Sequence, residues 1–348
     1  MPGRNAVGLD IGTSGVRAAE LSYGRDGITL EKFGQVALPE GAVRDGEVID
    51  QAVVVDALKA LWKGSGFREK RVALGVANQR VVVRQLDLPW MTRSELKVSL
   101  PLQVQEFLPM AVEDAVLDFH VTEELQGPEG RQLRGLLVAA AKDTVMSNVT
   151  AVQAAGLRVT SVDLTSFAVL RGTGRPHSDV GTEALLDIGA RVSNLVIHSG
   201  GVPRFVRVLL SGGQDVTDAI AERLGVPAAL AEAVKRGTDE QLTPEERELA
   251  TSALQLMREV FVDEVRSSLD YYGASNPQFP VERILVSGGG SLLDGIAPHL
   301  QQVTRKPVDT GDVLGRVRLG RTGLDEDQLA AIQPLAAVPV GLALGVIS

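Results

Sequence analysis

Cysteine is absent from the 348-residue sequence. Its absence excludes disulfide bonds, thiolate metal sites and a cysteine nucleophile, and it suits a reducing compartment. Histidine is nearly as scarce, because only four are present and none stands at the spacing of a metal-binding motif. We expect solvated or structural roles for all four, which are His120, His177, His198 and His299.

Excess positive charge is missing as well. The formal net charge is −9, and the isoelectric point is near 5.1. This balance argues against a broad basic surface for nucleic acid or anionic lipid. We therefore expect no nucleic-acid partner.

Long apolar runs are missing too. The longest spans residues 334–347, which is 14 residues and is interrupted by Pro339, whereas a membrane-spanning helix needs roughly 20 apolar residues. We expect a buried helix there and no direct insertion into a membrane. The opening residues MPGRNAVG lack the apolar core and cleavage site of a signal peptide, which predicts a cytoplasmic protein.

The sequence does contain an internal repeat. The stretch VGLDIGTSGVRAAEL (7–21) is echoed about half a chain later by ALLDIGARVSNLVI (184–197). Each copy continues as three strand-like runs and then a helical segment, at 51–63 and at 214–224. Two homologous α/β halves are the simplest interpretation. Chance similarity is the alternative, because Asp and Gly are common in the turn after a strand.

Each copy places a carboxylate at the end of its first strand, Asp10 in one and Asp187 in the other. A turn rich in Gly, Thr and Ser offers backbone N–H groups and hydroxyls to phosphate oxygens, but a carboxylate beside it would repel phosphate. A divalent metal between them removes the conflict, because Mg²⁺ takes one or two carboxylates and keeps several waters. The paired hairpins therefore predict a phosphate and Mg²⁺ site.

Two further features fit this site. Arg17 on the second strand can reach back to phosphates, although a solvated strand residue is an equal alternative. A buried strand at 284–286 runs into the glycines 288–290 and then into a helix whose apolar face begins at Leu292; three glycines allow close approach of a flat ligand. Neither a P-loop nor a dinucleotide-binding glycine motif is present.

The three elements DIGT, DIG and GGG, in this order, resemble the actin-like ATPase superfamily of actin, heat-shock ATPases, sugar kinases and FtsA-type cell-division actins. Segments at 81–121, 209–226, 263–272 and 341–345 narrow the resemblance to the PilM family of type IV pilus assembly proteins. The resemblance implies a duplicated actin-like (ribonuclease H-like) α/β fold, with two lobes around a nucleotide cleft and an inserted α/β subdomain.

The resemblance also implies site residues for ATP and Mg²⁺. Asp10 and Asp187 would be the catalytic and metal-binding carboxylates. The phosphates would contact the hairpin and connecting residues Gly12, Thr13, Ser14, Arg17, Gly189, Gly212, Gly213 and Gln214. The nucleoside would contact Gly288, Gly289, Gly290, Glu264 and Ser268. The family's second motif is usually a run of small residues where this chain has Arg191, so we expect at most a slow ATPase.

The same resemblance predicts a division into subdomains. Subdomain 1A would comprise 1–79, with 157–180 and a C-terminal helix at 334–348; the inserted 1C would be 80–156; 2A would be 181–213 and 270–333; and 2B would be 214–269. Within the insertion, the pattern predicts a helix at 93–107, strands at 116–124 and 133–140, and a helix at 143–155. We expect a linker between the halves at 174–183.

The implied function is an ATP-binding scaffold of the pilus assembly platform, which serves twitching motility in many bacteria. Its partner would be the cytoplasmic N-terminal peptide of PilN, a bitopic membrane protein, bound between subdomains 1A and 1C, and pilus motor ATPases would be a further partner. That docking would recruit the protein to the cytoplasmic face of the membrane. The alternatives are a sugar-type small-molecule kinase and a filament-forming actin of the cell-division type.

Overall fold

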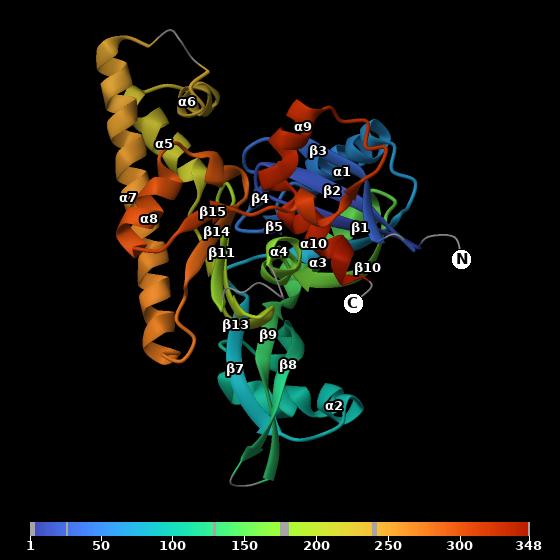
Figure 1. The fold of residues 1–348 in the computed structure, drawn as a ribbon. Helices are drawn as coiled ribbons and strands as arrows, with labels where there is room; N and C mark the ends of the chain where they lie inside the picture. The colour runs from blue at the N-terminus through green and yellow to red at the C-terminus, as the bar shows by residue number, and fades with distance from the viewer. Residues whose placement is uncertain (1–3, 26, 128–129, 175–180, 239–241, 347–348) are drawn as a thin grey trace.

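The computed structural model describes residues 4–25, 27–127, 130–174, 181–238 and 242–346. Two central sheets, one in each half of the chain, form two lobes (Figure 1). The first sheet contains, in spatial order, β10 (Arg158–Leu164), β6 (Arg71–Val76), β1 (Arg4–Ile11), β2 (Gly15–Gly24), β3 (Gly27–Ala37) and β16 (Arg318–Leu319). The second contains β15 (Val308–Thr310), β14 (Arg283–Ser287), β11 (Thr182–Ile188), β12 (Ser193–Ser199) and β13 (Val202–Leu209).

The two sheets share one topology. In each, an antiparallel meander of three strands is followed by two strands that run parallel to the first strand of the meander. The meander β1–β2–β3 thus corresponds to β11–β12–β13, and β6 and β10 correspond to β14 and β15. This repetition confirms that the motif echo reflects a duplicated α/β fold.

A pair of helices packs between the two sheets. These are α4 (Thr165–Thr173) and α10 (Ala337–Gly345), and their side chains share a buried cluster with both sheets, including Ala73 of β6 and Leu185 of β11 (Figure 1). The helices approach closely through glycine, since a Cβ at Gly341 would lie 1.8 Å from the carbonyl oxygen of Ala168. Seven of the nine residues of α10 are buried, which confirms the expected buried helix.

Outer helices cover the remaining faces. On the first lobe these are α1 (Gln51–Ser65), which is capped by Asp50, and α3 (Lys142–Ala154). On the second lobe, α7 (Pro244–Ser275) and α8 (Ile296–Thr304) pack on the sheet, and α5 (Gly213–Leu224) and α6 (Ala228–Lys235) pack against α7. A capping box of Thr243 and Glu246 begins α7.

The inserted segment forms a small sheet of its own, which projects at the bottom of Figure 1. Its order is β7 (Val82–Pro89), β9 (Gly130–Ala141) and β8 (Ala115–Gly127), with α2 (Arg93–Val104) packed on it. Pro101 lies within α2, and residues 105–107 tighten into a 3₁₀ turn. The expected strands and helices are all present.

Some packing differs from the sequence-based expectation. Residues of α3, which fall within the range predicted for the insertion, pack in the core of the first lobe beside α1. Val313, Val317 and Ile332, within the range predicted for subdomain 2A, pack on the first sheet, where β16 pairs with β3 and α9 (Glu326–Ile332) follows. Burial against apolar neighbours distant in sequence decides both placements. The subdomain bounds otherwise stay a prediction.

The structure corrects the start of the helix that we expected from Leu292. Residues Gly289–Leu292 form a 3₁₀ turn, and α8 begins only at Ile296, after Gly295 in the left-handed conformation (φ 70°). Leu292 is consequently 70% exposed. Of the linker expected at 174–183, residues 175–180 lie outside the described residues, and so does His177.

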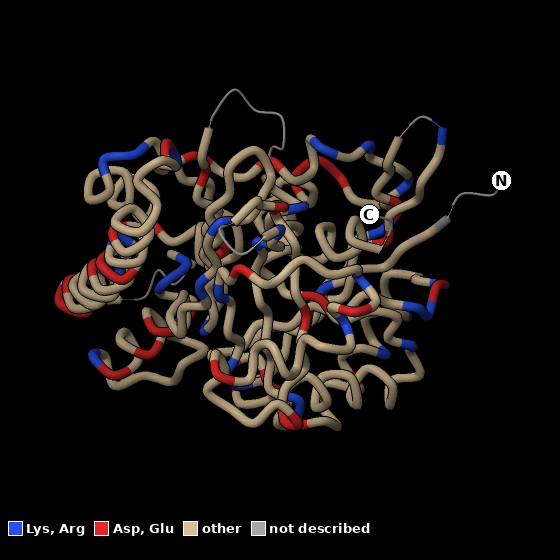
Figure 2. Tube along the Cα trace, turned by 90° about the horizontal axis from the view of Figure 1, so that it is seen from below, with Lys and Arg blue, Asp and Glu red and all other residues tan. Residues whose placement is uncertain are grey.

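No single helix in the described ranges is long and apolar enough to cross a membrane. Two consecutive helical segments, Glu326–Leu335 and Ala337–Gly345, are together long and apolar enough by length and composition alone. They are bent by 73° relative to each other. In the view from below, Lys and Arg are interspersed with Asp and Glu (Figure 2).

Candidate functional site

The two hairpins present matched carboxylates. Asp10 pairs across the ladder with Arg17, and Asp187 pairs at the equivalent position with Asn194. Both carboxylates stand at the ends of buried strands, which hold them in place by their hydrogen-bonded neighbours. The repeat thus brings a carboxylate to the same corner of each lobe.

The first hairpin combines a carboxylate with a cation. Arg17 Nη1 lies 3.8 Å from Asp10 Oδ2, and Arg17 Nη2 lies 3.5 Å from Ser14 Oγ. Burial raises the pKa of Asp10, and the Arg17 charge opposes that rise. The Nε of Arg17 is buried without a hydrogen-bond partner among the described residues. A buried N–H donor in this state leaves room for an oxygen acceptor.

The turn of this hairpin leaves space in front of Arg17. The Gly12 N–H donates to the Gly15 carbonyl over 3.0 Å, and a Cβ at Gly12 would come within 3.3 Å of Arg17 Nη1. Thr13 and Ser14 form the bend between these glycines, with Ser14 exposed. The residues expected to contact phosphate therefore lie together beside Asp10.

The second carboxylate is buried more deeply, since Asp187 is 8% exposed. The Ser287 hydroxyl donates to Asp187 Oδ1 over 2.8 Å. Burial is the main cause that raises the pKa of Asp187 to about 6, and repulsion by Asp10 adds to it, while Ser287 and Arg17 oppose it. The charge of Asp10 on the first lobe therefore influences the pKa of Asp187 on the second.

The loop after Asp187 is joined to the start of α5. The Gly213 N–H donates to the Gly189 carbonyl over 3.0 Å, and the Gln214 N–H donates to Ala190 over 2.7 Å. Gly212 fits only without a side chain, because its Cβ would lie 2.4 Å from the Gly189 carbonyl oxygen. The structure thus brings the expected residues Gly189, Gly212, Gly213 and Gln214 together, but these amides of α5 serve the loop itself.

Arg191, at the position where the family usually has a small residue, is held by carboxylates. Its guanidinium pairs with Asp218 at 2.6 Å and Asp215 at 3.2 Å, both on α5, and with Glu40 of the first lobe at 3.5 Å. No sequence pattern indicated these partners, which come from another helix and from the other lobe.

The glycines expected at the nucleoside lie against the second hairpin. Gly288 has φ +81°, and a Cβ at Gly290 would lie 2.4 Å from Ile188 Cγ2. Gly290 also lies close to the start of α5, because a Cβ added to Gly213 would be 3.8 Å from the Cα of Gly290. Only Gly289 has open space, with Leu335 at 3.4 Å as its nearest neighbour. Packing against β11 therefore accounts for two of the three glycines.

Glu264 and Ser268, the two residues of α7 that we expected at the nucleoside, have different surroundings. The Ser211 hydroxyl donates to Glu264 Oε2 over 2.6 Å, which links α7 to the loop before α5. Ser268 is fully buried, and its hydroxyl donates to the carbonyl of Glu264 on its own helix. Of these two residues, Glu264 is the one that stays partly exposed.

The donor set suits Mg²⁺ and phosphate. Two carboxylates plus water oxygens match the ligands that Mg²⁺ takes in nucleotide sites. A cation beside them would relieve the repulsion by Asp10, which adds to the effect of burial on the pKa of Asp187. The unpaired Arg17 Nε supplies a donor for phosphate. No group of three or more His, Asp or Glu residues able to hold a metal occurs among the described residues, so a dedicated protein cage for a metal is not observed there.

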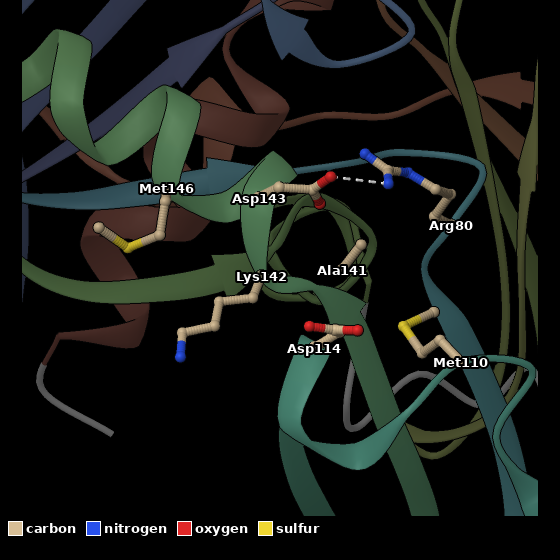
Figure 3. Close-up of a pocket in the computed structure, with 7 residues that line it drawn as sticks. All are labelled: Arg80, Met110, Asp114, Ala141, Lys142, Asp143 and Met146. Carbon is tan, nitrogen blue, oxygen red and sulfur yellow. Dashed lines mark hydrogen bonds and ion pairs between the residues drawn. The ribbon is translucent and has the colours of Figure 1, made fainter.

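A separate pocket lies between α3 and the inserted sheet (Figure 3). Its volume is about 590 Å³, and its lining comprises Arg80, Met110, Asp114, Ala141, Lys142, Asp143 and Met146. Arg80 bonds to Asp143 at 2.9 Å, to Thr144 at 2.6 Å and to Glu47 at 3.2 Å. No sequence motif indicated these residues, because the pocket forms only when the insertion packs beside α3.

Comparison with known proteins gives concordant matches. The model of a family described as type IV pilus assembly protein PilM matches residues 8–346. A solved structure, the PilM-PilN type IV pilus biogenesis complex, superimposes with a TM-score of 0.85 at 28% identity, covering 99% of this chain and 98% of that chain.

More distant relatives are cell division proteins FtsA. The protein from Pseudomonas aeruginosa is 25% identical, with 89% of this chain and 83% of that protein covered. The protein from Bacillus subtilis is 22% identical over 66% of this chain, which spans only 57% of that protein. These matches confirm the expected actin-like superfamily.

Proposed function

The chain belongs to the type IV pilus assembly protein PilM family, whose model matches residues 8–346, and on this premise we propose that it is an ATP-binding scaffold of the pilus assembly platform. The observation that supports the nucleotide role is the placement of Asp10 and Asp187 at equivalent ends of β1 and β11. Arg17 lies 3.8 Å from Asp10, and its Nε is buried without a hydrogen-bond partner among the described residues. Any hydrolysis is slow, and nucleotide occupancy serves to set the arrangement of the lobes.

Asp10 and Asp187 would hold Mg²⁺, which would supply charge neutralisation for the phosphates. Arg17 donates to phosphate oxygens, together with the hairpin residues Gly12, Thr13 and Ser14. Gly189 and the start of α5 form the opposite wall. Gly289 and Glu264 are the residues most open to the nucleoside, since Gly288 and Gly290 pack on Ile188 and Ser268 is buried.

The partner is the N-terminal cytoplasmic peptide of a PilN-type membrane protein, which binds in the pocket between α3 and the inserted sheet. The similar solved structure is a PilM-PilN complex. The residues that line the pocket all fall within the range predicted for subdomain 1C, and those of α3 belong to a helix that packs on the first lobe. Met110 and Met146 offer adaptable apolar contacts, and Asp114 and Lys142 place one charge of each sign at the lining (Figure 3). An extended segment with an apolar side chain between polar neighbours fits this lining.

Peptide docking recruits the protein to the cytoplasmic face of the membrane, where it contributes to pilus assembly and thereby to twitching motility. Motor ATPases of the machine are its further partners.

Calorimetric titration with a synthetic N-terminal peptide of the PilN encoded in the same genome tests the scaffold role. We expect saturable binding to the wild type and loss of binding in Met146→Glu. Leu256→Glu is the matched control, because Leu256 on α7 is 46% exposed and Met146 is 47% exposed. Failure of the wild type to bind, or equal binding by both variants, would contradict the assigned partner site.

A further inference from the structure

The segment 39–50 connects the nucleotide site to the pocket. It follows β3 directly beside the first hairpin, where the Leu38 N–H donates to the Ser14 carbonyl over 3.0 Å. It contains a short hairpin, β4 (Val43–Arg44) and β5 (Glu47–Val48), and ends at Asp50, the cap of α1. Val43 and Val48 are buried in the core of the first lobe, which fixes the middle of the segment.

At one end, the segment carries an ion pair between the lobes. Glu40 of the first lobe lies 3.5 Å from the Nη2 of Arg191, which belongs to the loop after Asp187. Arg191 is anchored on its own lobe by Asp215 and Asp218. Glu40 is 66% exposed and has the longer contact, so it is the partner that a competing anion displaces most easily.

At the other end, the hairpin tip is fixed to the wall of the pocket. Asn78 Nδ2 donates to the Asp45 carbonyl over 2.6 Å, and Asn148 Nδ2 on α3 donates to the Gly46 carbonyl over 2.9 Å. Glu47 pairs with Arg80 at 3.2 Å, and Arg80 lines the pocket. Asp45 and Gly46 both have positive φ, 51° and 82°, as a tight two-residue hairpin requires.

This tip has no freedom to slide, because a Cβ at Gly46 would stand 1.7 Å from the carbonyl oxygen of Ala77. Residues 45–47, residues 77–80 and the start of α3 therefore move as one body. Between Glu40 and Glu47, Ala42 and Val43 are buried, and the carbonyls of Asp45 and Gly46 accept hydrogen bonds, so the segment provides a short route from Glu40 to the pocket.

We propose that segment 39–50 couples nucleotide occupancy to peptide affinity, with the Arg191–Glu40 pair as its switch; this inference rests on the proposed function. Nucleotide phosphate beside the loop 189–192 competes with Glu40 for the Arg191 guanidinium, since phosphate carries more charge and more acceptor oxygens than one exposed carboxylate. Release of Glu40 repositions the segment and the Arg80 side of the pocket. The state without nucleotide retains the pair.

Glu40→Gln provides the test, because it weakens the pair without changing a residue assigned to ATP, Mg²⁺ or peptide. The dissociation constant of the synthetic PilN peptide is measured with and without saturating Mg-ATP, for the wild type, E40Q, R191Q and the exposed α7 control Glu259→Gln. We expect a change of at least about 5-fold on adding Mg-ATP to the wild type and to E259Q, the low end of ordinary allosteric coupling.

In E40Q and R191Q the change should fall below about 2-fold. E40Q without nucleotide should already bind the peptide with the affinity of the nucleotide-bound wild type. A wild-type response retained in E40Q would overturn the coupling role of the segment, and so would a wild type that binds peptide equally in both states. A wild type that binds no peptide in either state would overturn the proposed function itself.

Discussion

Replacing Asp187 by Asn tests the electrostatics of the candidate site directly. Burial, with repulsion by Asp10, raises the pKa of Asp187 from 3.8 to about 6. Because the folded-state pKa is the higher one, ionisation of Asp187 costs stability. The cost is absent below the unfolded pKa, grows as the pH rises between the two values, and is complete above pH 6. A difference of about 2 pKa units corresponds to about 3 kcal/mol at pH 7.

Asn removes the charge, keeps the shape and can still accept the hydrogen bond from Ser287. Without nucleotide, the free energy of unfolding of D187N should therefore exceed that of the wild type by about 3 kcal/mol at pH 7 and by about 1 kcal/mol at pH 4.5. Urea titrations at the two pH values measure both differences. Asp270→Asn, at an exposed position on α7, controls for the general effect of removing a carboxylate.

The reasoning would be refuted by a D187N variant no more stable than the wild type at pH 7, or by a gap that stays constant at pH 4.5. The same variant should lose Mg²⁺-dependent ATP binding under the proposed function. A variant that is more stable but no longer binds the ligand is expected when the wild type keeps a destabilising charge because the ligand requires it.

The remaining predictions concern the first hairpin and the helix pair. Asp10→Ala should abolish Mg²⁺-dependent ATP binding while the circular dichroism spectrum stays that of the wild type; unchanged nucleotide affinity would exclude a metal role for Asp10. Gly341→Ala should lower the free energy of unfolding by about 1–3 kcal/mol or more, because its Cβ would lie 1.8 Å from the Ala168 carbonyl oxygen. Gly64→Ala in α1 is the control, since no heavy atom lies within 4 Å of its added Cβ, and an equal loss in both variants would contradict the packing argument.

The sequence predicts what short-range patterns determine. Each hairpin is encoded by an apolar strand, a turn and a second strand, so the positions of Asp10 and Asp187 follow from local pattern and from the repeat. The start of α7 at Thr243 follows from its capping box. The start of α8 does not, because Gly295 permits a left-handed turn that the apolar spacing of its neighbours does not indicate.

Long-range packing determines the rest. Arg80 and Met146 have no distinguishing local pattern, and they line one pocket only because α3 packs on the first lobe beside the inserted sheet. The partners of Arg191 come from α5 and from the other lobe. Val317 packs on the first sheet together with Val313, although β15 at 308–310 belongs to the second sheet. No periodic pattern of apolar residues in the sequence predicts these contacts.

The duplicated halves repeat one fold but not one electrostatic environment. Opposite Asp10 stands Arg17, whereas opposite Asp187 stands Asn194, a buried residue that accepts a hydrogen bond from Ser166 on α4. Arg17 thus lies 3.8 Å from the first carboxylate, whereas the charge of the second is offset mainly by Ser287 and to a smaller extent by Arg17. Under the proposed function, protonation of Asp187 and binding of Mg²⁺ are therefore competing ways to neutralise one buried charge. Under the proposed function, the affinity for Mg-ATP should fall as the pH is lowered through about 6, the pKa of Asp187. Calorimetric titration at pH 7.5 and pH 5.5 measures that fall, and equal affinities would place the metal away from Asp187.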